Sequence, residues 1–345
     1  MKTVESVTIG HPDKVCDQIS DAILDEYLRR DPEARVAVEA FGGHGALIIG
    51  GEVTSKESFD VASLALSVYR DIGYRDSLEP FVNIESQSPE IAKAVDTGGA
   101  GDQGIMYGYA TLETPEFLPP VFVFARGIVQ RLSDLRLNHP DFYWLGPDGK
   151  AQVTMDRGKV KKVVVSTQHD EEANIDEVRE KIIKHVITPT IGSLDGVEVI
   201  ANPAGTFLAG GFSADAGLTG RKIMVDTYGG IIPHGGGAFS GKDPSKVDRS
   251  GAYMARFAAK NIVAGGFAKN CLVSVAYAIG KNKPIMLTAR DGQGRDLTNI
   301  LKDKFDFRPE AIIEQLNLKR PIYRDTAASG HFGREGLPWE EVINI

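Results

Sequence analysis

The amino-acid sequence predicts an α+β fold with an internal repeat. Helix-like and strand-like segments alternate along the chain without the regular strand–helix–strand order of a parallel α/β sheet. A Gly/Pro turn followed by a Lys-Val pair and an amphipathic helix also occurs twice, at residues 10–17 and 241–248. A chance match of common turn and helix residues is the alternative explanation. A true repeat would bring two similar helix starts to one shared site.

Hydrophobic spacing and turn residues predict the individual elements. The first helix is predicted at residues 13–30, because apolar side chains recur there at helical spacing directly after Pro12. The other predicted elements, in chain order, are strands at 35–41 and 46–53, a helix at 58–72, a buried strand at 121–125, a hairpin of strands at 152–155 and 160–167, a helix at 175–186 that ends before Pro189, a helix at 250–264 and a strand at 271–279.

Length and composition exclude several classes of protein. The 345 residues predict two or three domains, and 39 Lys+Arg against 47 Asp+Glu give a net charge of −8. Coating of nucleic acid or of an anionic membrane needs a basic footprint, so no nucleic-acid or membrane partner is expected. Cys16 and Cys271 have no metal-binding spacing and are too few for a disulfide scaffold. No secretory signal or stretch near 18 apolar residues is present, which predicts a cytoplasmic protein.

The chain contains 38 glycines, well above the average share of about 7%. Two glycine-rich segments imitate phosphate loops. Residues 99–104 match G-x-G-x-x-G, but the chain that follows does not open a helix, as a dinucleotide-binding loop requires. Residues 236–242 match G-x-x-x-x-G-K, but Asp243 stands where that motif needs Ser or Thr. Neither segment is therefore predicted to be a standard nucleotide-binding loop.

Residues 234–249 nevertheless predict an anion site. Lys242 and Lys246 follow a run of glycines, and glycines can turn successive backbone N–H groups toward a ligand. Two lysines beside such backbone suit a polyphosphate. A flexible surface loop with solvated charges is the alternative.

The first helix start predicts related chemistry. His11 could donate to a phosphate or a leaving oxygen, and Asp13 could bind Mg²⁺. Ordinary helix capping is the alternative for both. Asp248 opens the second, similar helix, so two carboxylates from two helix starts could share magnesium ions that bridge phosphates.

Other charged residues stand at positions that favour ligand contact. Lys150, Arg221 and Lys222 each follow a glycine-containing turn, and they are either phosphate contacts or surface charges. Glu39 and Glu52 stand at the ends of apolar strand segments, where a carboxylate needs a metal or an amine as partner.

Five motifs together resemble the S-adenosylmethionine synthetase family over nearly the whole chain, from residue 5 to residue 339. They are Gly-His-Pro-Asp-Lys at 10–14, Gly-Ala-Gly-Asp-Gln-Gly at 99–104, Asp-Ala-Gly-Leu-Thr-Gly-Arg-Lys at 215–222, the glycine-rich run ending at residue 249, and Gly-His-Phe-Gly-Arg at 330–334. The resemblance implies three similar α+β domains with a pseudo-threefold repeat, each a β-sheet backed by helices. We expect sequence segments at 1–97, 98–218 and 219–345, with the structural domains interleaved.

The resemblance also implies a reaction and an assembly. Methionine sulfur attacks C5′ of ATP, and the displaced tripolyphosphate is cleaved to pyrophosphate and phosphate before S-adenosylmethionine leaves. It implies Mg²⁺, with two ions per site, and K⁺ as cofactors. It further implies a homodimer, or a dimer of dimers, with active sites between subunits.

Position by position, the resemblance implies four groups of site residues. Catalytic roles fall to His11, Lys150, Arg221 and Lys242. The ATP contacts comprise these four together with Asp102, Asp148, Phe207, Asp215, Lys222 and Ala238. The methionine pocket comprises Glu52, Gln87, Asp215 and Lys246. The metal ligands are Asp13 and Asp248 for Mg²⁺ and Glu39 for K⁺.

The chain also departs from the family pattern. It is shorter between residues 74 and 87 and between residues 95 and 101. The second of these gaps falls where the family carries the loop that closes over methionine. Arg126 stands where a histidine is usual. Two other functions are therefore considered: a nucleotide-binding regulatory protein without turnover, and a plain triphosphatase. The complete set of charged site residues disfavours the first, and the methionine-pocket residues disfavour the second.

Overall fold

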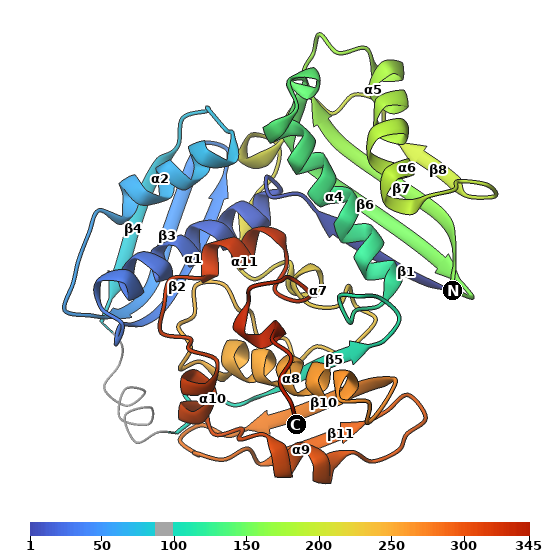
Figure 1. The fold of residues 1–345 in the computed structure, drawn as a ribbon. Coiled ribbons are helices and arrows are strands. Elements are labelled where there is room, and N and C mark those ends of the chain that lie inside the picture. Colours follow the sequence, from blue (N-terminus) through green and yellow to red (C-terminus); the bar gives the residue numbers. More distant parts are fainter. Residues whose placement is uncertain (87–98) are drawn as a thin grey trace.

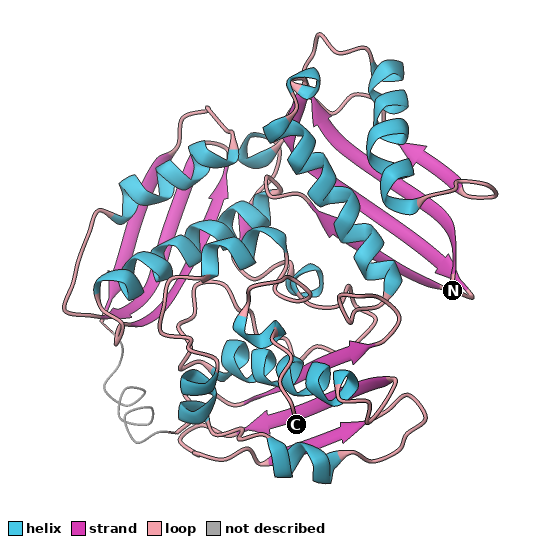
Figure 2. Cartoon of the chain, in the orientation of Figure 1, coloured by secondary structure: helices cyan, strands magenta, loops and turns pink. Residues whose placement is uncertain are grey.

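The computed structural model describes residues 1–86 and 99–345 and contains three β-sheets, each covered by a long helix (Figure 1). In Figure 2 the sheets stand apart as three groups of strands with helices across them. The α+β class and the three helix-backed sheets predicted from the sequence are confirmed.

The first sheet has the strand order β1-β6-β7-β8. Its strands are β1 (Lys2–Val7), β6 (Leu145–Asp156), β7 (Lys159–His169) and β8 (Glu198–Ala201). The N-terminal strand β1 pairs antiparallel with β6, more than a hundred residues later in the chain. Helix α4 (Pro120–Asn138) packs on β1 and β6. The short helices α5 (Ile175–Ile182) and α6 (Thr188–Ile191) follow β7, joined by a π-helical turn at Ile183–Ile187.

The second sheet has the strand order β4-β3-β2-β9. Its strands are β2 (Arg35–Gly43), β3 (Ala46–Thr54), β4 (Glu79–Glu85) and β9 (Gly217–Leu218). Helix α1 (Pro12–Arg30) packs on β2, and α2 (Val61–Ile72) packs beside α1. Helix α11 (Tyr323–Ser329), close to the C-terminus, also packs on α1.

The third sheet has the strand order β11-β10-β5. Its strands are β5 (Gly104–Thr111), β10 (Asn270–Tyr277) and β11 (Met286–Arg290). Helix α8 (Val247–Ala264) covers β5 and β10, with α9 (Thr298–Lys304) and α10 (Pro309–Gln315) nearby. The remaining short helices are α7 (Ile223–Asp226) and 3-10 turns at Pro140–Phe142, Gly211–Ser213 and Pro338–Glu340.

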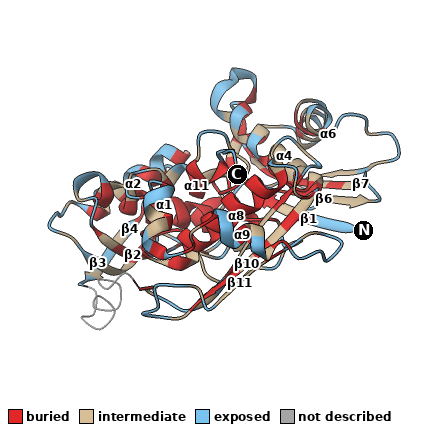
Figure 3. Cartoon of the chain, turned by 60° about the horizontal axis from the view of Figure 1, so that its bottom comes forward, coloured by how far each residue is buried: buried red, intermediate tan, exposed pale blue. Residues whose placement is uncertain are grey.

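Buried residues gather along α1 and α8 (Figure 3). Helix α8 is buried almost from end to end, including Arg249 and Arg256. Each of these guanidinium groups pairs with a buried carboxylate, Arg249 with Asp21 at 2.6 Å and Arg256 with Glu340 at 2.8 Å. Pairing is what makes such charges tolerable in a core. In the described ranges, no helix combines the length and apolar character that a membrane span needs.

Most predicted elements match the structure, but two predictions are wrong. Residues 121–125 belong to α4 and not to a strand. A short apolar run fits a buried strand and a buried helix equally well, and here burial recurs at helical spacing through Leu135. The helix at 175–186 was expected to end before Pro189, yet helical structure continues through it. Proline supplies no N–H for the carbonyl of His185, and Arg131 of α4 donates to that carbonyl instead.

Candidate active site

The start of α1 forms the first part of the candidate site. His11 is the N-cap residue, and its Nδ1 accepts a hydrogen bond from the backbone N–H of Asp13 at 3.2 Å. Pro12 occupies the first helical turn, where its missing N–H costs nothing. Gly217 of β9 lies so close to the Pro12 carbonyl that any Cβ there would overlap with it. The fold therefore presses the 215–222 motif against the helix start.

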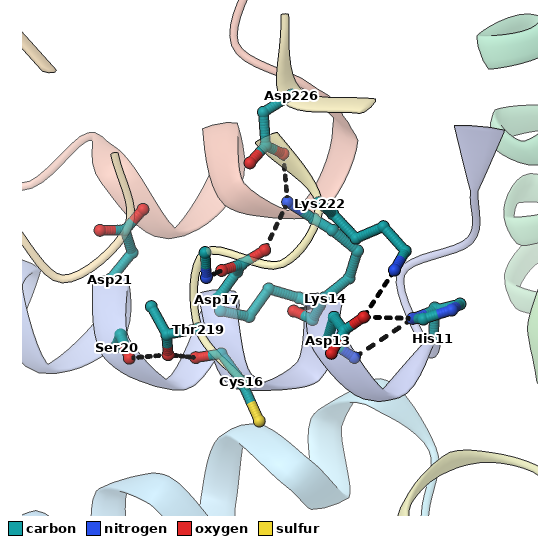
Figure 4. Close-up of polar contacts among 12 residues, drawn as sticks. His11, Asp13, Lys14, Cys16, Asp17, Ser20, Asp21, Thr219, Lys222 and Asp226 are labelled. Atoms are coloured by element: carbon teal, nitrogen blue, oxygen red, sulfur yellow. Dashed lines mark hydrogen bonds and ion pairs between the residues drawn. The ribbon is translucent and has the colours of Figure 1, made fainter. Parts of the chain in front are cut away.

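Asp13 connects this helix start to that motif (Figure 4). Its carboxylate is 2% exposed and accepts the backbone N–H of Leu218 at 2.9 Å. Lys222 Nζ lies 2.5 Å from Oδ2, and Arg221 Nε lies 3.5 Å from Oδ1. Two cations thus neutralise one buried carboxylate, and both were predicted to contact phosphate.

Burial and the charges around His11 set its protonation state. Burial, followed by the positive charge of Lys222, lowers the pKa of His11 to about 4, although Asp13 acts in the opposite direction. The imidazole is therefore neutral at pH 7. Because Nδ1 accepts the Asp13 N–H, the ring proton is on Nε2. His11 can offer that N–H to an oxygen atom of a ligand.

A cavity of about 550 Å³ opens beside His11. Its lining includes four other predicted ATP contacts: Asp148, Lys150, Phe207 and Asp215. Asp148 is buried and accepts the Gly211 N–H at 3.0 Å, and burial raises its pKa to about 6. Lys150 pairs with Glu5 at 2.8 Å. The volume and the mixture of an aromatic ring with charged groups suit a small polar ligand.

A second group of predicted residues lies at the start of α8. Lys242 Nζ is 2.5 Å from the Asp248 carboxylate, and Lys246 Nζ is 2.5 Å from Asp243. A Cβ at Gly237 would overlap with the Asp248 carboxylate, so the glycine-rich run is required for this approach. Gly104, two residues after Asp102, also lies beside Asp248.

Lys242, from this second group, shares a face of the second sheet with the predicted site residues Glu39 and Glu52. Lys242 bridges Ala37 of β2, and Ala37 is the register partner of Glu52 on β3. Directly opposed residues point to the same side of a sheet, so Lys242 and Glu52 occupy one face. Glu39, two residues from Ala37, lies on that face and is exposed.

The structure therefore divides the predicted residues into two groups. The first group is His11, Asp13, Asp148, Lys150, Phe207, Asp215, Arg221 and Lys222. The second group is Glu39, Glu52, Asp102, Ala238, Lys242, Lys246 and Asp248. Across residues 1–86 and 99–345, no hydrogen bond or ion pair joins side chains of the two groups, although Ala238 lies beside Gly220. Gln87 lies outside the described residues.

Family models match the chain in three consecutive parts. The S-adenosylmethionine synthetase N-terminal domain matches residues 1–97, the central domain matches 97–207 and the C-terminal domain matches 209–341. The chain belongs to the S-adenosylmethionine synthetase family. It is therefore a member of a transferase family.

Curated relatives agree over nearly the full length. The S-adenosylmethionine synthase of Pseudothermotoga lettingae is 48% identical, and the alignment covers 99% of this chain and 96% of the relative. The corresponding proteins of Thermus thermophilus and Staphylococcus epidermidis are 48% and 45% identical with the same coverage. The first alignment spans 381 positions, more than the 345 residues of this chain, so the relative has residues that this chain lacks.

The side chains of this family member can be compared with the ligands that Mg²⁺ requires. In the part of the chain that the structure describes, no group of three or more His, Cys, Asp or Glu side chains is arranged to hold a metal. Asp13 and Asp248 instead offer one carboxylate each, in separate groups. Mg²⁺ commonly takes one or two carboxylates and completes its shell with substrate phosphates and water. The residues fit Mg²⁺ bound together with a polyphosphate.

Sequence reasoning missed several charged residues of this family member. Glu5 pairs with Lys150 at the cavity, and Lys14 pairs with Asp17 at 3.0 Å and with Asp226 at 2.5 Å. Asp17 carried a signal that was available, because acidic residues recur every four positions along the first helix. That spacing puts them on one face of the helix. Asp226 and Glu5 had no such signal.

Proposed function

We propose that this chain is a methionine adenosyltransferase. It converts ATP, L-methionine and water into S-adenosyl-L-methionine, pyrophosphate and phosphate. Family membership supports the synthase function. The observation that carries the mechanism is the group of cations around His11 and Asp13 at the edge of a cavity lined by Phe207.

In the proposed reaction, the attacking sulfur needs little catalytic assistance from the protein. The sulfur of methionine is neutral and attacks C5′ in line with the departing tripolyphosphate, so no general base is required. The tripolyphosphate gains negative charge as the C5′–O bond breaks, and preorganised donors stabilise such charge best. In this proposal His11 donates its Nε2–H to the leaving oxygen, while Lys150, Arg221 and Lys242 contact the phosphates. Asp102, Asp148, Lys222 and Ala238 complete the ATP contacts, with Phe207 stacked on adenine.

Two metal ions and one monovalent cation belong to the proposal. Asp13 and Asp248 would hold Mg²⁺, and Glu39 would hold K⁺. Mg²⁺, when bound, would neutralise phosphate charge. Without phosphates, Lys222 and Arg221 neutralise Asp13, and Lys242 neutralises Asp248. These contacts hold each carboxylate in place, so a metal–polyphosphate complex can bind by exchanging partners and without moving the backbone.

We also propose that the active site forms between two copies of the chain. Phe41, Ile48 and Phe81 are register partners across β2, β3 and β4, and they are 39%, 45% and 63% exposed. Such an apolar row is unusual on a surface that meets only water. It shares its face with Glu39 and Glu52. A second copy covering this face would bring its own His11 group to these acids.

In that assembly the methionine pocket contains Glu52, Gln87, Asp215 and Lys246. A carboxylate suits the ammonium of methionine, and a lysine or amide suits its carboxylate. The dimer is the smallest assembly that the proposal needs, and a dimer of dimers keeps the same sites. The cytoplasm is the proposed location, and the segments 1–97, 98–218 and 219–345 are the proposed division of the chain.

The decisive experiment follows three products at once. The chain is incubated with ATP, methionine, Mg²⁺ and K⁺, and S-adenosylmethionine, pyrophosphate and phosphate are quantified together. The proposal predicts equal amounts of all three. Phosphate release without the sulfonium product would favour a triphosphatase, and ATP binding without any product would favour a regulatory protein. In the same assay, His11→Ala should lower turnover by about 10²–10⁴-fold while ATP binding changes little.

A further inference from the structure

A second cavity lies on the other side of the connection between β1 and α1. It measures about 290 Å³ and is bounded by β1, α1, α4, α7, the end of α11 and the chain that follows α11. It shares no lining residue with the cavity beside His11. Ser6 to Ile9 line the second cavity, whereas Glu5 and His11 line the first.

The lining of this second cavity is strongly one-sided in charge. Three cationic side chains reach it, Lys14, Arg126 and Arg334, and none of the described residues that line it is acidic. Hydroxyl groups, among them those of Ser6, Thr8 and Ser329, and the amide of Gln130 are its other polar side chains. Positive groups and hydroxyls without a carboxylate are the composition of an anion site.

The three cations differ in how they are neutralised. Lys14 pairs with Asp17 and Asp226, so its charge is balanced. Arg126 is 5% exposed, and its hydrogen bonds within residues 1–86 and 99–345 go to the backbone carbonyls of Phe332 and Gly333. Arg334 donates to the backbone carbonyl of Asp325 at 2.6 Å. Among the residues described, no carboxylate forms an ion pair with Arg126 or Arg334.

Arg126 and Arg334 line this cavity without an ion-pair partner among the described residues; Arg126 is buried and Arg334 is half-buried. A buried charge needs a partner of opposite sign, and arginine keeps its proton in proteins. Burial lowers the pKa of Arg126 to about 10, although the more distant charges of Glu340 and Glu116 act in the opposite direction. An anion in the cavity would supply opposite charge to both side chains. Guanidinium groups have planar pairs of N–H donors that match the oxygens of phosphate.

We propose that this second cavity binds a phosphate-class oxyanion, inorganic phosphate or pyrophosphate, between Arg126 and Arg334. The site is separate from the proposed ATP site. Anion binding there requires no step of the proposed reaction, so binding measurements test this proposal independently of the proposed function.

The first test is calorimetric titration of phosphate and of pyrophosphate, in separate experiments. Because the ATP site also binds phosphates, the titrations use the full chain carrying Lys150→Ala and Lys222→Ala. We expect one site per chain that saturates by about 1 mM anion. The anion that binds more tightly, phosphate or pyrophosphate, is the one that the site prefers. Adding Arg126→Met or Arg334→Met should weaken binding at least tenfold. Arg136→Met is the matched control, because Arg136 is a half-buried arginine of the same helix that donates to the Ile72 carbonyl.

The variants are checked for folding by circular dichroism. If Arg126→Met unfolds, Arg334→Met decides, because Arg334 is less buried. Crystals of the wild-type chain soaked in selenate give an independent readout, with an anomalous peak expected between the two guanidinium groups. Binding that neither substitution weakens, or no binding and no peak, would overturn the proposal.

Discussion

At the residue scale, the candidate site is governed by the charge balance around Asp13 and His11. One buried carboxylate holds two cations, and burial together with one of these cations, Lys222, lowers the pKa of the neighbouring imidazole. The arrangement keeps His11 neutral and its Nε2–H available. The ion pairs of Asp13 with Lys222 and Arg221 depend on its negative charge, so removing that charge would weaken both.

His11 should titrate far below an ordinary histidine. Proton NMR of the imidazole should give a pKa of about 4 in the wild-type chain without ligands. Lys222→Met should raise that pKa, because a nearby positive charge disfavours the imidazolium. Lys159→Met, an exposed lysine of β7, is the control and should leave it unchanged. The unfolded chain protonates this histidine near pH 6.5, so His11 costs stability as the pH falls from about 6.5 toward 4. A wild-type value near 6.5 would contradict this account.

Asp13→Asn should raise the Mg²⁺ requirement of the proposed reaction. Asparagine retains an oxygen for the Leu218 N–H but has no charge for a metal or for Lys222. We expect the half-saturating Mg²⁺ concentration to increase at least tenfold, measured by titrating Mg²⁺ at fixed ATP and methionine. Asp60→Asn, an exposed N-cap residue of α2, is the control. An unchanged Mg²⁺ titration would remove Asp13 from the proposed metal site.

At the element scale, one face of α1 organises the loops around the site. Asp13, Asp17, Asp21 and Asp25 recur every four residues, and each accepts backbone N–H groups from a distant segment. In chain order, these donors are Leu218, Gly220, Gly241 and the pair Tyr323 and Arg324. Figure 4 shows the first part of this acidic face, with Lys14 between Asp17 and Asp226. The helix thus fixes both site-bearing loops to one rigid element.

Two substitutions on this acidic face should differ sharply in their effect on stability. Asp21→Asn removes the only partner in the described ranges that forms an ion pair with the buried Arg249. Breaking such a pair costs about 3–5 kcal/mol. Asp25 accepts two N–H groups without an ion pair, and burial raises its pKa to about 7. Asp25→Asn should therefore cost less than about 2 kcal/mol. Urea denaturation measures both, and equal costs would refute the distinction.

Most elements could be predicted because their hydrophobic spacing is local information. The helix that became α1 carries both its period and its starting proline in the sequence. The exceptions depend on tertiary contacts. Helical structure continues through Pro189 because Arg131, on another helix, satisfies the freed carbonyl of His185. Residues 121–125 were ambiguous because a five-residue apolar run has no decisive period.

At the scale of the whole molecule, the sequence allows candidate site residues to be proposed by type but does not show how the fold groups them. Lys242 and Asp248 are close in sequence, so their pairing at 2.5 Å is consistent with the helix-start motif. Their separation from His11 and Asp13 follows from the sheet topology, which puts Lys242 beside β2 and His11 beside the cavity at β6. No local pattern encodes that division.

The division makes a mixing experiment decisive for the proposed assembly. If each site combines the His11 group of one chain with the Lys242 group of its partner, His11→Ala and Lys242→Ala damage different halves. A heterodimer purified with two different tags then contains one intact site and one doubly damaged site. By the twofold symmetry of a dimer, it should recover about half of the wild-type turnover, although both parent homodimers are nearly inactive. A heterodimer of His11→Ala with Lys222→Ala is the control, because both substitutions lie in the same group and leave no intact site. A first heterodimer as inactive as its parents, or an active monomer, would show that one chain builds the whole site.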